Sequence, residues 1–205
     1  MQIKLAEIGK KFNREWIFRD LNFKFISGST YAIHGPNGSG KSTLLKIISS
    51  AELPSKGTIN YNLPKEGDLE ASEMYKHISY VGPYMNLPEL LTIQEIYEFN
   101  SKFKEIKLDF SSFIEKVYLK NDLKKPIKNY SSGMKQRLKL GLSILSNSSL
   151  LILDEPCSNL DKMGVELYQS LLKENSNNRT ILIGSNEDKN ETFMAEQAIN
   201  IMNYK

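Results

Sequence analysis

The chain has 205 residues, of which 40 % are hydrophobic and 25 % charged, and this composition excludes a disordered or fibrous protein. Its 27 basic and 24 acidic residues give a net charge of +3, which is too balanced to indicate a nucleic-acid surface. The longest apolar run, Leu150 to Leu153, has four residues, whereas a membrane-spanning helix needs about 20. The single cysteine, Cys157, has no partner in the chain for a disulfide, which fits a reducing compartment.

The N-terminal residues predict a β-rich unit. Apolar residues alternate over 3–8 and again over 21–25, and the polar segment 10–15 between them indicates an antiparallel pair of strands. A third β-rich run, 30–34, leads into a glycine-rich segment, and residues 43–49 have helical character after it.

The middle of the chain predicts an inserted helical subdomain. Thr92 and Glu95 form a capping box before one helix, Ser111 or Ser112 caps a second, and a third begins near Ser132. Buried strands are predicted over 150–153 and 180–183, with a helix over 163–173 between them. We therefore expect a single α/β domain, with a core over 1–84 and 148–205 and a helical subdomain over 85–147.

Residues 35–42 match the pattern G-x-x-x-x-G-K-[ST] between a predicted strand and a predicted helix. Glycines let successive backbone N–H groups surround a phosphate, and the start of a helix adds partial positive charge. Lys41 is expected to reach the β- and γ-phosphates, and the Ser42 hydroxyl to bind Mg²⁺. The segment predicted to bind a nucleoside triphosphate comprises Gly35, Pro36, Asn37, Gly38, Ser39, Gly40, Lys41, Ser42 and Thr43.

Two carboxylates follow the apolar run at 150–153. Ligands of α/β sheets bind at the carboxyl ends of the strands, where Asp154 and Glu155 are predicted to lie. We expect Asp154 to hold the water shell of Mg²⁺ and Glu155 to orient and polarise the attacking water. Glu155 and Lys41 are the predicted catalytic residues.

Three further segments make the resemblance specific. Tyr130–Arg137 (YSSGMKQR) is followed by Leu153–Pro156 (LDEP) and then by Ser158–Asp161 (SNLD). Together with the phosphate loop, the order and spacing of these segments resemble those of an ABC-type ATPase, which is a P-loop NTPase. The resemblance covers essentially the whole chain. The resemblance implies a P-loop core with a mostly parallel sheet, an N-terminal antiparallel β subdomain and an inserted α-helical subdomain.

The resemblance also implies a two-fold dimer that encloses two ATP molecules. Ser131 and Gly133 of one subunit would then contact, in trans, the nucleotide on the phosphate loop of the other, and Asp161 resembles the residue that communicates across the dimer. Phe12 falls where an aromatic ring stacks on adenine, with Trp16 as the alternative, and either ring could instead pack in the core.

Three positions depart from the family pattern. Ser132 replaces a glycine of the signature, which the small serine side chain tolerates. Pro83 stands where the family has a glutamine near Mg²⁺ and the attacking water, and proline offers no side-chain ligand. Asn186 replaces a histidine; it can bond a γ-phosphate oxygen but carries no positive charge. We therefore expect a slow ATPase.

The leading functional hypothesis is the ATP-binding subunit of an ABC membrane transporter that works with separate transmembrane permease subunits, as a homodimer or heterodimer. Residues 84–88 would receive a short helix of the permease, which would place the chain in the cytoplasm at the inner face of the membrane. A non-hydrolysing ATP switch paired with another ATPase is the alternative. A DNA-maintenance or ribosome-associated ATPase is a third, but the basic run 120–128 favours a solvated face, and we expect no nucleic-acid partner.

Overall fold

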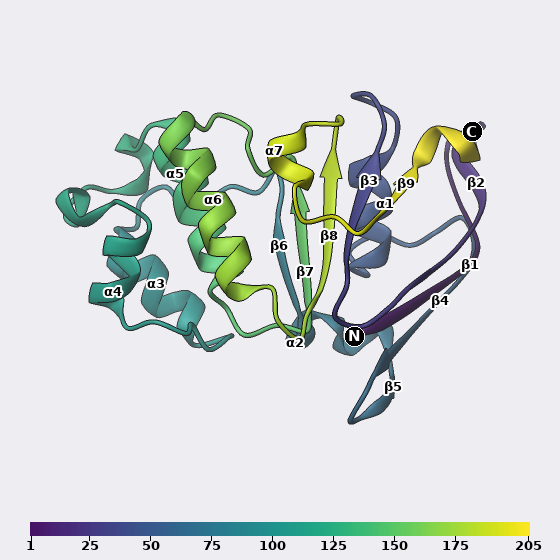
Figure 1. The fold of residues 1–205 in the computed structure, drawn as a ribbon, viewed down its shortest axis with the longest axis horizontal. Helices are drawn as coiled ribbons and strands as arrows, with labels where there is room; N and C mark the ends of the chain where they lie inside the picture. The colour runs from purple at the N-terminus through teal and green to yellow at the C-terminus, as the bar shows by residue number, and fades with distance from the viewer.

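A five-stranded parallel sheet forms the centre of the computed structural model, which describes residues 1–205 (Figure 1). The strands lie in the order β6-β7-β8-β3-β9, and every pair is parallel. Their bounds are β3 Thr30–His34, β6 Ile78–Val81, β7 Leu150–Asp154, β8 Thr180–Ser185 and β9 Gln197–Asn200. This order confirms the mostly parallel core expected from the sequence.

Strand β7 shows why its sequence is apolar at every position. Leu150 and Ile152 belong to one hydrophobic core, whereas Leu151 and Leu153 belong to the other. Because successive side chains of a strand point to opposite faces, a strand covered on both sides needs apolar residues throughout. All four are fully buried, so the sheet separates two cores that share its strands.

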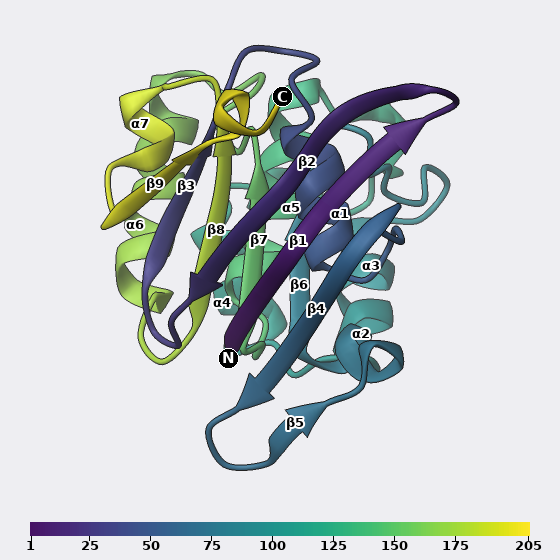
Figure 2. The ribbon, with the colours of Figure 1, turned by 90° about the vertical axis from the view of Figure 1, so that its right-hand side faces the viewer.

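A second, antiparallel sheet covers the first core. It has the order β2-β1-β4-β5, with β1 Gln2–Phe12, β2 Glu15–Phe25, β4 Lys56–Leu63 and β5 Gly67–Leu69. Helix α1 (Lys41–Ile48) lies between this sheet and the parallel one (Figure 2). The predicted pair of strands is confirmed, but both strands are longer than expected and only Asn13 and Arg14 connect them. The sequence analysis had not predicted β4, β5 or β9.

The segment between β6 and β7 contains three of the longer helices and confirms the inserted helical region. These are α3 Ile93–Ser101, α4 Phe110–Lys116 and α5 Ser132–Ile144. Thr92 forms the predicted capping box with Glu95, and Ser131 caps α5. The predicted cap of α4 was wrong. The capping residue is Asp109, not Ser111 or Ser112, because the Asp109 carboxylate accepts a hydrogen bond from the Ser112 N–H in the first turn (2.9 Å).

The remaining helices complete the layers around the sheet. Helix α6 (Lys162–Asn175) packs beside α5 on the face opposite α1, as Figure 1 shows. Short helices α2 (Met74–His77) and α7 (Lys189–Thr192) precede β6 and follow β8. Four 3₁₀ turns occupy Ala71–Glu73, Lys120–Asp122, Ile127–Asn129 and Ile201–Tyr204. No helix combines the length and apolar composition that crossing a bilayer requires.

Gly141 permits the close approach of α5 and α4, and its replacement gives a first prediction. A Cβ added at Gly141 would lie 2.3 Å from Val117 Cγ1 and 3.2 Å from Phe113 Cε2, and both neighbours are fully buried. We expect Gly141→Ala to lower the free energy of unfolding by about 1–3 kcal/mol, because overpacking outweighs the higher helix propensity of alanine. Urea denaturation measures this, with the exposed Ser132→Ala in the same helix as control; equal stability of both variants would contradict it.

Candidate functional site

A cavity of about 420 Å³ opens at the carboxyl ends of β3 and β7. The loop after β3, the residue after β7 and the turn after β6 all contribute to its wall, together with the β1–β2 hairpin. Its lining residues are Phe12, Ile17, Asn37, Gly38, Gly40, Lys41, Ser42, Thr43, Pro83, Tyr84 and Glu155. The structure thus brings together most of the predicted phosphate loop with Glu155 and Phe12.

The loop between β3 and α1 has a backbone that requires glycine. Gly38 and Gly40 have φ angles of 75° and 108°, in the left-handed region that L-residues avoid. A Cβ at Gly40 would also lie 2.6 Å from Ile17 Cγ2. The glycine spacing of the motif therefore follows from the conformation of the loop, which ends where α1 begins at Lys41.

Lys41 folds back over the loop. Its ammonium donates to the Gly35 carbonyl (2.8 Å) and the Pro36 carbonyl (3.2 Å), and it lies 3.9 Å from Glu155 Oε1. The Lys41 side chain is almost fully buried. A buried ammonium that is held only by carbonyls and one carboxylate can exchange these partners for the oxygens of a bound phosphate.

Asp154 ends β7 and is buried behind the loop. Its Oδ2 lies 3.4 Å from the Tyr80 hydroxyl, the Ser42 hydroxyl lies near its carboxylate, and its Oδ1 has no hydrogen-bond partner. Burial raises the pKa of the Asp154 carboxyl, and the nearby Ser42 hydroxyl opposes that shift. A buried acceptor without a partner is the position where a metal-bound water would complete the contacts.

Glu155 is held in an uncommon backbone conformation. Its φ angle is 50°, in the left-handed region that costs a non-glycine residue roughly 1 kcal/mol. Its N–H donates to the Gly184 carbonyl of β8 (2.9 Å), which fixes the turn after β7. The side chain is partly exposed to the cavity, where it faces Lys41.

Phe12 and Trp16, the two candidates for adenine stacking, lie differently. Phe12 lines the cavity and is 48 % exposed, whereas Trp16 is 39 % exposed and lies outside the cavity. Neither ring is buried in the core, and the geometry favours Phe12.

The turn Gly82–Met85 carries the departure at position 83. The Met85 N–H donates to the Gly82 carbonyl (3.2 Å), so Pro83 and Tyr84 are the two central residues of a tight turn. Both line the cavity. Pro83 therefore lies in the cavity wall, where it contributes neither an N–H nor a polar side chain.

Seven predicted residues do not line the cavity: Gly35, Pro36, Ser39 and Asp154 belong to the loop or lie behind it, whereas Asn186, Ser131 and Gly133 lie away from it. Asn186 is exposed in the loop after β8, and Ser131 and Gly133 lie at the start of α5 in the helical region. Gly133 instead packs near the Asn159 carbonyl, which a Cβ would approach to 3.1 Å.

Glu191 is a buried carboxylate that the sequence analysis did not single out. It is 5 % exposed in α7, and its Oε1 accepts from the Cys157 N–H (3.1 Å) while its carbonyl accepts from the Tyr168 hydroxyl (2.7 Å). The Ser185 hydroxyl also bonds its carboxylate. Glu191 thus ties the segment after Glu155 to the end of β8. Nothing in its sequence context distinguishes it from a surface glutamate.

The burial of Glu191 predicts a pH-dependent stability. Burial raises the pKa of this carboxyl, so the folded state favours its protonated form; the stabilisation is present below the unfolded pKa and is lost as pH rises through the folded pKa. Relative to Glu191→Gln, the wild type should therefore lose stability as pH rises above the ordinary pKa range of a glutamate. Urea denaturation at a series of pH values measures it, with the exposed Glu187→Gln as control; a difference that does not vary with pH would contradict it.

Residues 18–158 match the family model described as ABC transporter. The chain belongs to the ABC transporter family. It is 31 % identical over 193 residues to the lantibiotic transport ATP-binding protein SrtF of Streptococcus pyogenes, which covers 89 % of this chain and 79 % of that protein. It is 34 % identical over 170 residues to the zinc import ATP-binding protein ZnuC of Wigglesworthia glossinidia brevipalpis, covering 83 % and 68 %.

Among solved structures, the ABC chain superposes on the ATP-binding cassette MJ0796 with a TM-score of 0.81 and 25 % identity, covering 97 % of this chain and 94 % of that one. That structure is a dimer in a post-hydrolysis state bound to ADP and phosphate. The ABC chain described here is therefore an ATP-binding ATPase subunit of its family, with ATP and Mg²⁺ as its ligands.

Proposed function

We propose that this chain is the ATPase that drives an ABC transporter whose membrane-spanning part is formed by separate permease chains. The observation that carries the proposal is the cavity at the ends of β3 and β7, where Lys41 and Glu155 approach to 3.9 Å beside the glycine loop. A cationic loop and one carboxylate at the same cavity suit phosphoryl transfer to water.

The phosphate loop would bind the triphosphate. Residues 35–43 would surround the phosphates with backbone N–H groups, and the Lys41 ammonium would leave the Gly35 carbonyl to pair with phosphate oxygens. Phe12 would stack on adenine from the β1 side of the cavity.

Ser42 and Asp154 would hold Mg²⁺. The unpartnered, buried Oδ1 of Asp154 and the adjacent Ser42 hydroxyl form an oxygen donor set of the kind that Mg²⁺ prefers. When bound there, the ion would neutralise negative charge on the phosphate oxygens. Because the Asp154 carboxylate lies behind the loop and does not line the cavity, it would act through the water molecules bound to Mg²⁺, which it would orient.

Glu155 would orient and polarise the attacking water. Its left-handed backbone and its bond to Gly184 direct the side chain into the cavity, where a carboxylate can accept a proton. Asn186 would bond the γ-phosphate without adding charge, and Pro83 would add nothing. We therefore propose that hydrolysis is slow.

Dimerisation would complete the site. Ser131 and Gly133 begin α5 with N–H groups and a hydroxyl accessible to solvent, and they lie away from their own cavity. A second subunit would bring this helix start to the γ-phosphate in trans. We also propose that 1–84 with 148–205 and 85–147 form the two structural units that approach each other in the dimer.

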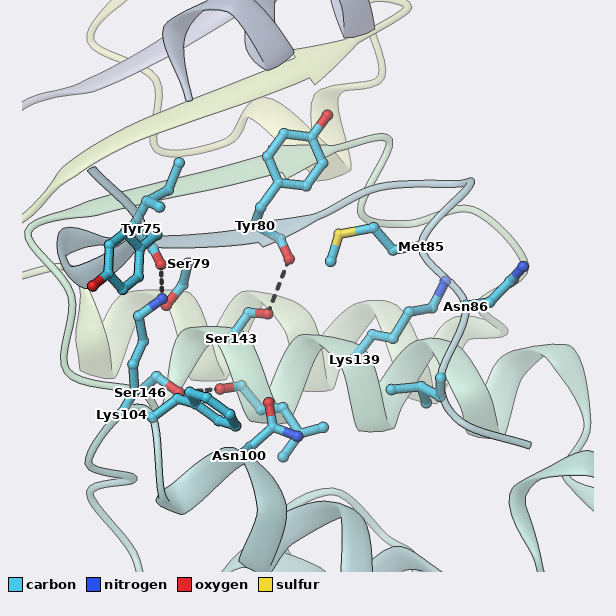
Figure 3. Close-up of a pocket in the computed structure, with 14 residues that line it drawn as sticks. Tyr75, Ser79, Tyr80, Met85, Asn86, Asn100, Lys104, Lys139, Ser143 and Ser146 are labelled. Atoms are coloured by element: carbon cyan, nitrogen blue, oxygen red, sulfur yellow. Dashed lines mark hydrogen bonds between the residues drawn. The ribbon is translucent and has the colours of Figure 1, made fainter. Parts of the chain in front are cut away.

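A groove between β6, α2 and α5 supports docking of the permease. Two adjoining cavities, of about 380 and 800 Å³, share Tyr75, Ile78, Tyr80 and Met85. Figure 3 shows the smaller of the two. Their apolar lining suits a short amphipathic helix. Of the predicted docking segment 84–88, residues 85–87 line this groove, whereas Tyr84 faces the nucleotide cavity. Docking there would place the chain in the cytoplasm, at the inner face of the membrane.

Cell fractionation tests the docking. The native chain should pellet with membranes, and Met85→Asp should move most of it to the soluble fraction, because a carboxylate in the apolar groove would be desolvated on docking. The control is Ile26→Asp, since Ile26 is equally exposed at the end of β2, away from the groove. Release of both variants, or of neither, would contradict the docking site.

Steady-state hydrolysis by the purified chain tests the ATPase itself. Phosphate release that requires Mg²⁺ and disappears in Lys41→Ala is the expected result. Failure of the wild type to bind ATP would contradict the proposed function.

A further inference from the structure

Tyr80 lies between the groove and the nucleotide site. It is the third residue of β6 and lines both cavities of the groove, the smaller of which Figure 3 shows. Its hydroxyl lies 3.4 Å from Asp154 Oδ2. In the figure the hydroxyl points away from the other labelled residues of the groove. A phenol carries its proton at neutral pH, so this contact is an O–H donated to a carboxylate.

The ring of Tyr80 has little freedom. A Cβ at Gly82 would lie 2.7 Å from the ring atom Cε1, so the ring rests directly on the backbone that opens the Pro83 turn. The Tyr80 carbonyl accepts a bond from Ser143 Oγ of α5 (3.3 Å). The hydroxyl is therefore held in one place.

We infer that Tyr80 is a positioning residue for ATP hydrolysis, whose hydroxyl anchors one oxygen of Asp154 and so fixes the other toward the water shell of Mg²⁺. This inference rests on the proposed function, in which Asp154 holds that ion. A contact at one oxygen restrains the rotation of the carboxylate, and Oδ1 is the oxygen left without a partner.

Because Pro83 cannot contribute a polar side chain near Mg²⁺, the contact between Tyr80 and Asp154 matters more for the metal site. Position 83 lies in the cavity wall but supplies no side-chain donor or acceptor. Tyr80 is the side chain that donates to the Asp154 carboxylate, and the Ser42 hydroxyl lies near it. Loss of either hydroxyl should weaken Mg²⁺ binding more than it weakens the binding of the phosphates, which the backbone N–H groups of the loop and Lys41 would hold.

The test compares ATP affinity with and without Mg²⁺ in Tyr80→Phe, which keeps the ring and removes the hydroxyl. Equilibrium dialysis with labelled ATP should give the wild-type affinity in EDTA, whereas the gain in affinity on adding Mg²⁺ should fall about five- to tenfold. Mn²⁺ binding in the presence of ATP, followed by electron paramagnetic resonance, should weaken by a similar factor. The kcat of ATP hydrolysis should also fall.

Tyr61→Phe is the matched control. It removes another buried phenol hydroxyl, which donates to the Ile48 carbonyl (3.0 Å) and lies outside the site, and it should leave the Mg²⁺ gain unchanged. An unchanged Mg²⁺ gain in Tyr80→Phe would overturn the inference, as would an equal loss in Tyr61→Phe. A wild type that fails to bind ATP would overturn the proposed function and the inference with it, so the two failures are distinguishable.

Discussion

Replacing Glu155 by glutamine is expected to lower the rate of Mg²⁺-dependent ATP hydrolysis by roughly 100- to 10,000-fold, the contribution of a positioned general base. ATP should still bind. The Lys41 contacts with Gly35 and Pro36 do not involve Glu155, and the variant removes a negative charge 3.9 Å from the ammonium that receives the phosphates. The nucleotide-bound dimer should therefore accumulate.

Three measurements check this result. Phosphate release gives the turnover, equilibrium dialysis gives the ATP affinity, and size-exclusion chromatography with ATP gives the dimer fraction. Glu187→Gln removes an exposed carboxylate of the loop after β8 and should behave as the wild type. Turnover that is unchanged in Glu155→Gln would refute the role of Glu155, whereas loss of ATP binding would indicate a structural role.

Restoring the two family residues, in the double variant Pro83→Gln and Asn186→His, is expected to raise kcat by about tenfold to 100-fold. Preorganised donors at the reacting phosphate are the largest catalytic contribution in such sites, and one donor is worth about 100-fold or more. Pro83 is exposed in the cavity wall and Asn186 is exposed after β8, so both changes add a polar group without disturbing the core.

Single variants separate the two effects. Pro83→Ala removes the ring without adding an amide and should leave kcat near the wild type, as should Asn186→Ala. An increase in Pro83→Ala equal to that in Pro83→Gln would show that the stiffness of the Gly82–Met85 turn, not the missing amide, limits turnover. No increase in the double variant would place the slow step outside the chemistry.

Local patterns predicted the parts of the fold whose causes are local. The glycine loop follows from backbone conformations that only glycine adopts freely, and β7 follows from its burial on both faces. The β4–β5 hairpin was missed because its polar residues alternate weakly and its pairing with β1 is long-range. The cap of α4 was misplaced because Asp109 and both serines are all good capping residues.

The site residues likewise fall into those that a sequence motif predicts and those that it does not. Lys41, Ser42, Asp154 and Glu155 carry a motif, and the structure brings them to one place. Glu191 and Tyr80 carry none, because their importance comes from partners 34 and 74 residues distant in the chain. A buried glutamate and a strand tyrosine have no distinguishing neighbours in sequence.

Strand β7 contributes alternate side chains to two hydrophobic cores, and we therefore expect it to be among the last segments to unfold locally. Loss of either core exposes half of β7, so its amide hydrogens can exchange with solvent only when both cores are lost together. They should be among the slowest to exchange in the chain. The carboxylates that end the strand, Asp154 and Glu155, should therefore keep their position when either core alone opens.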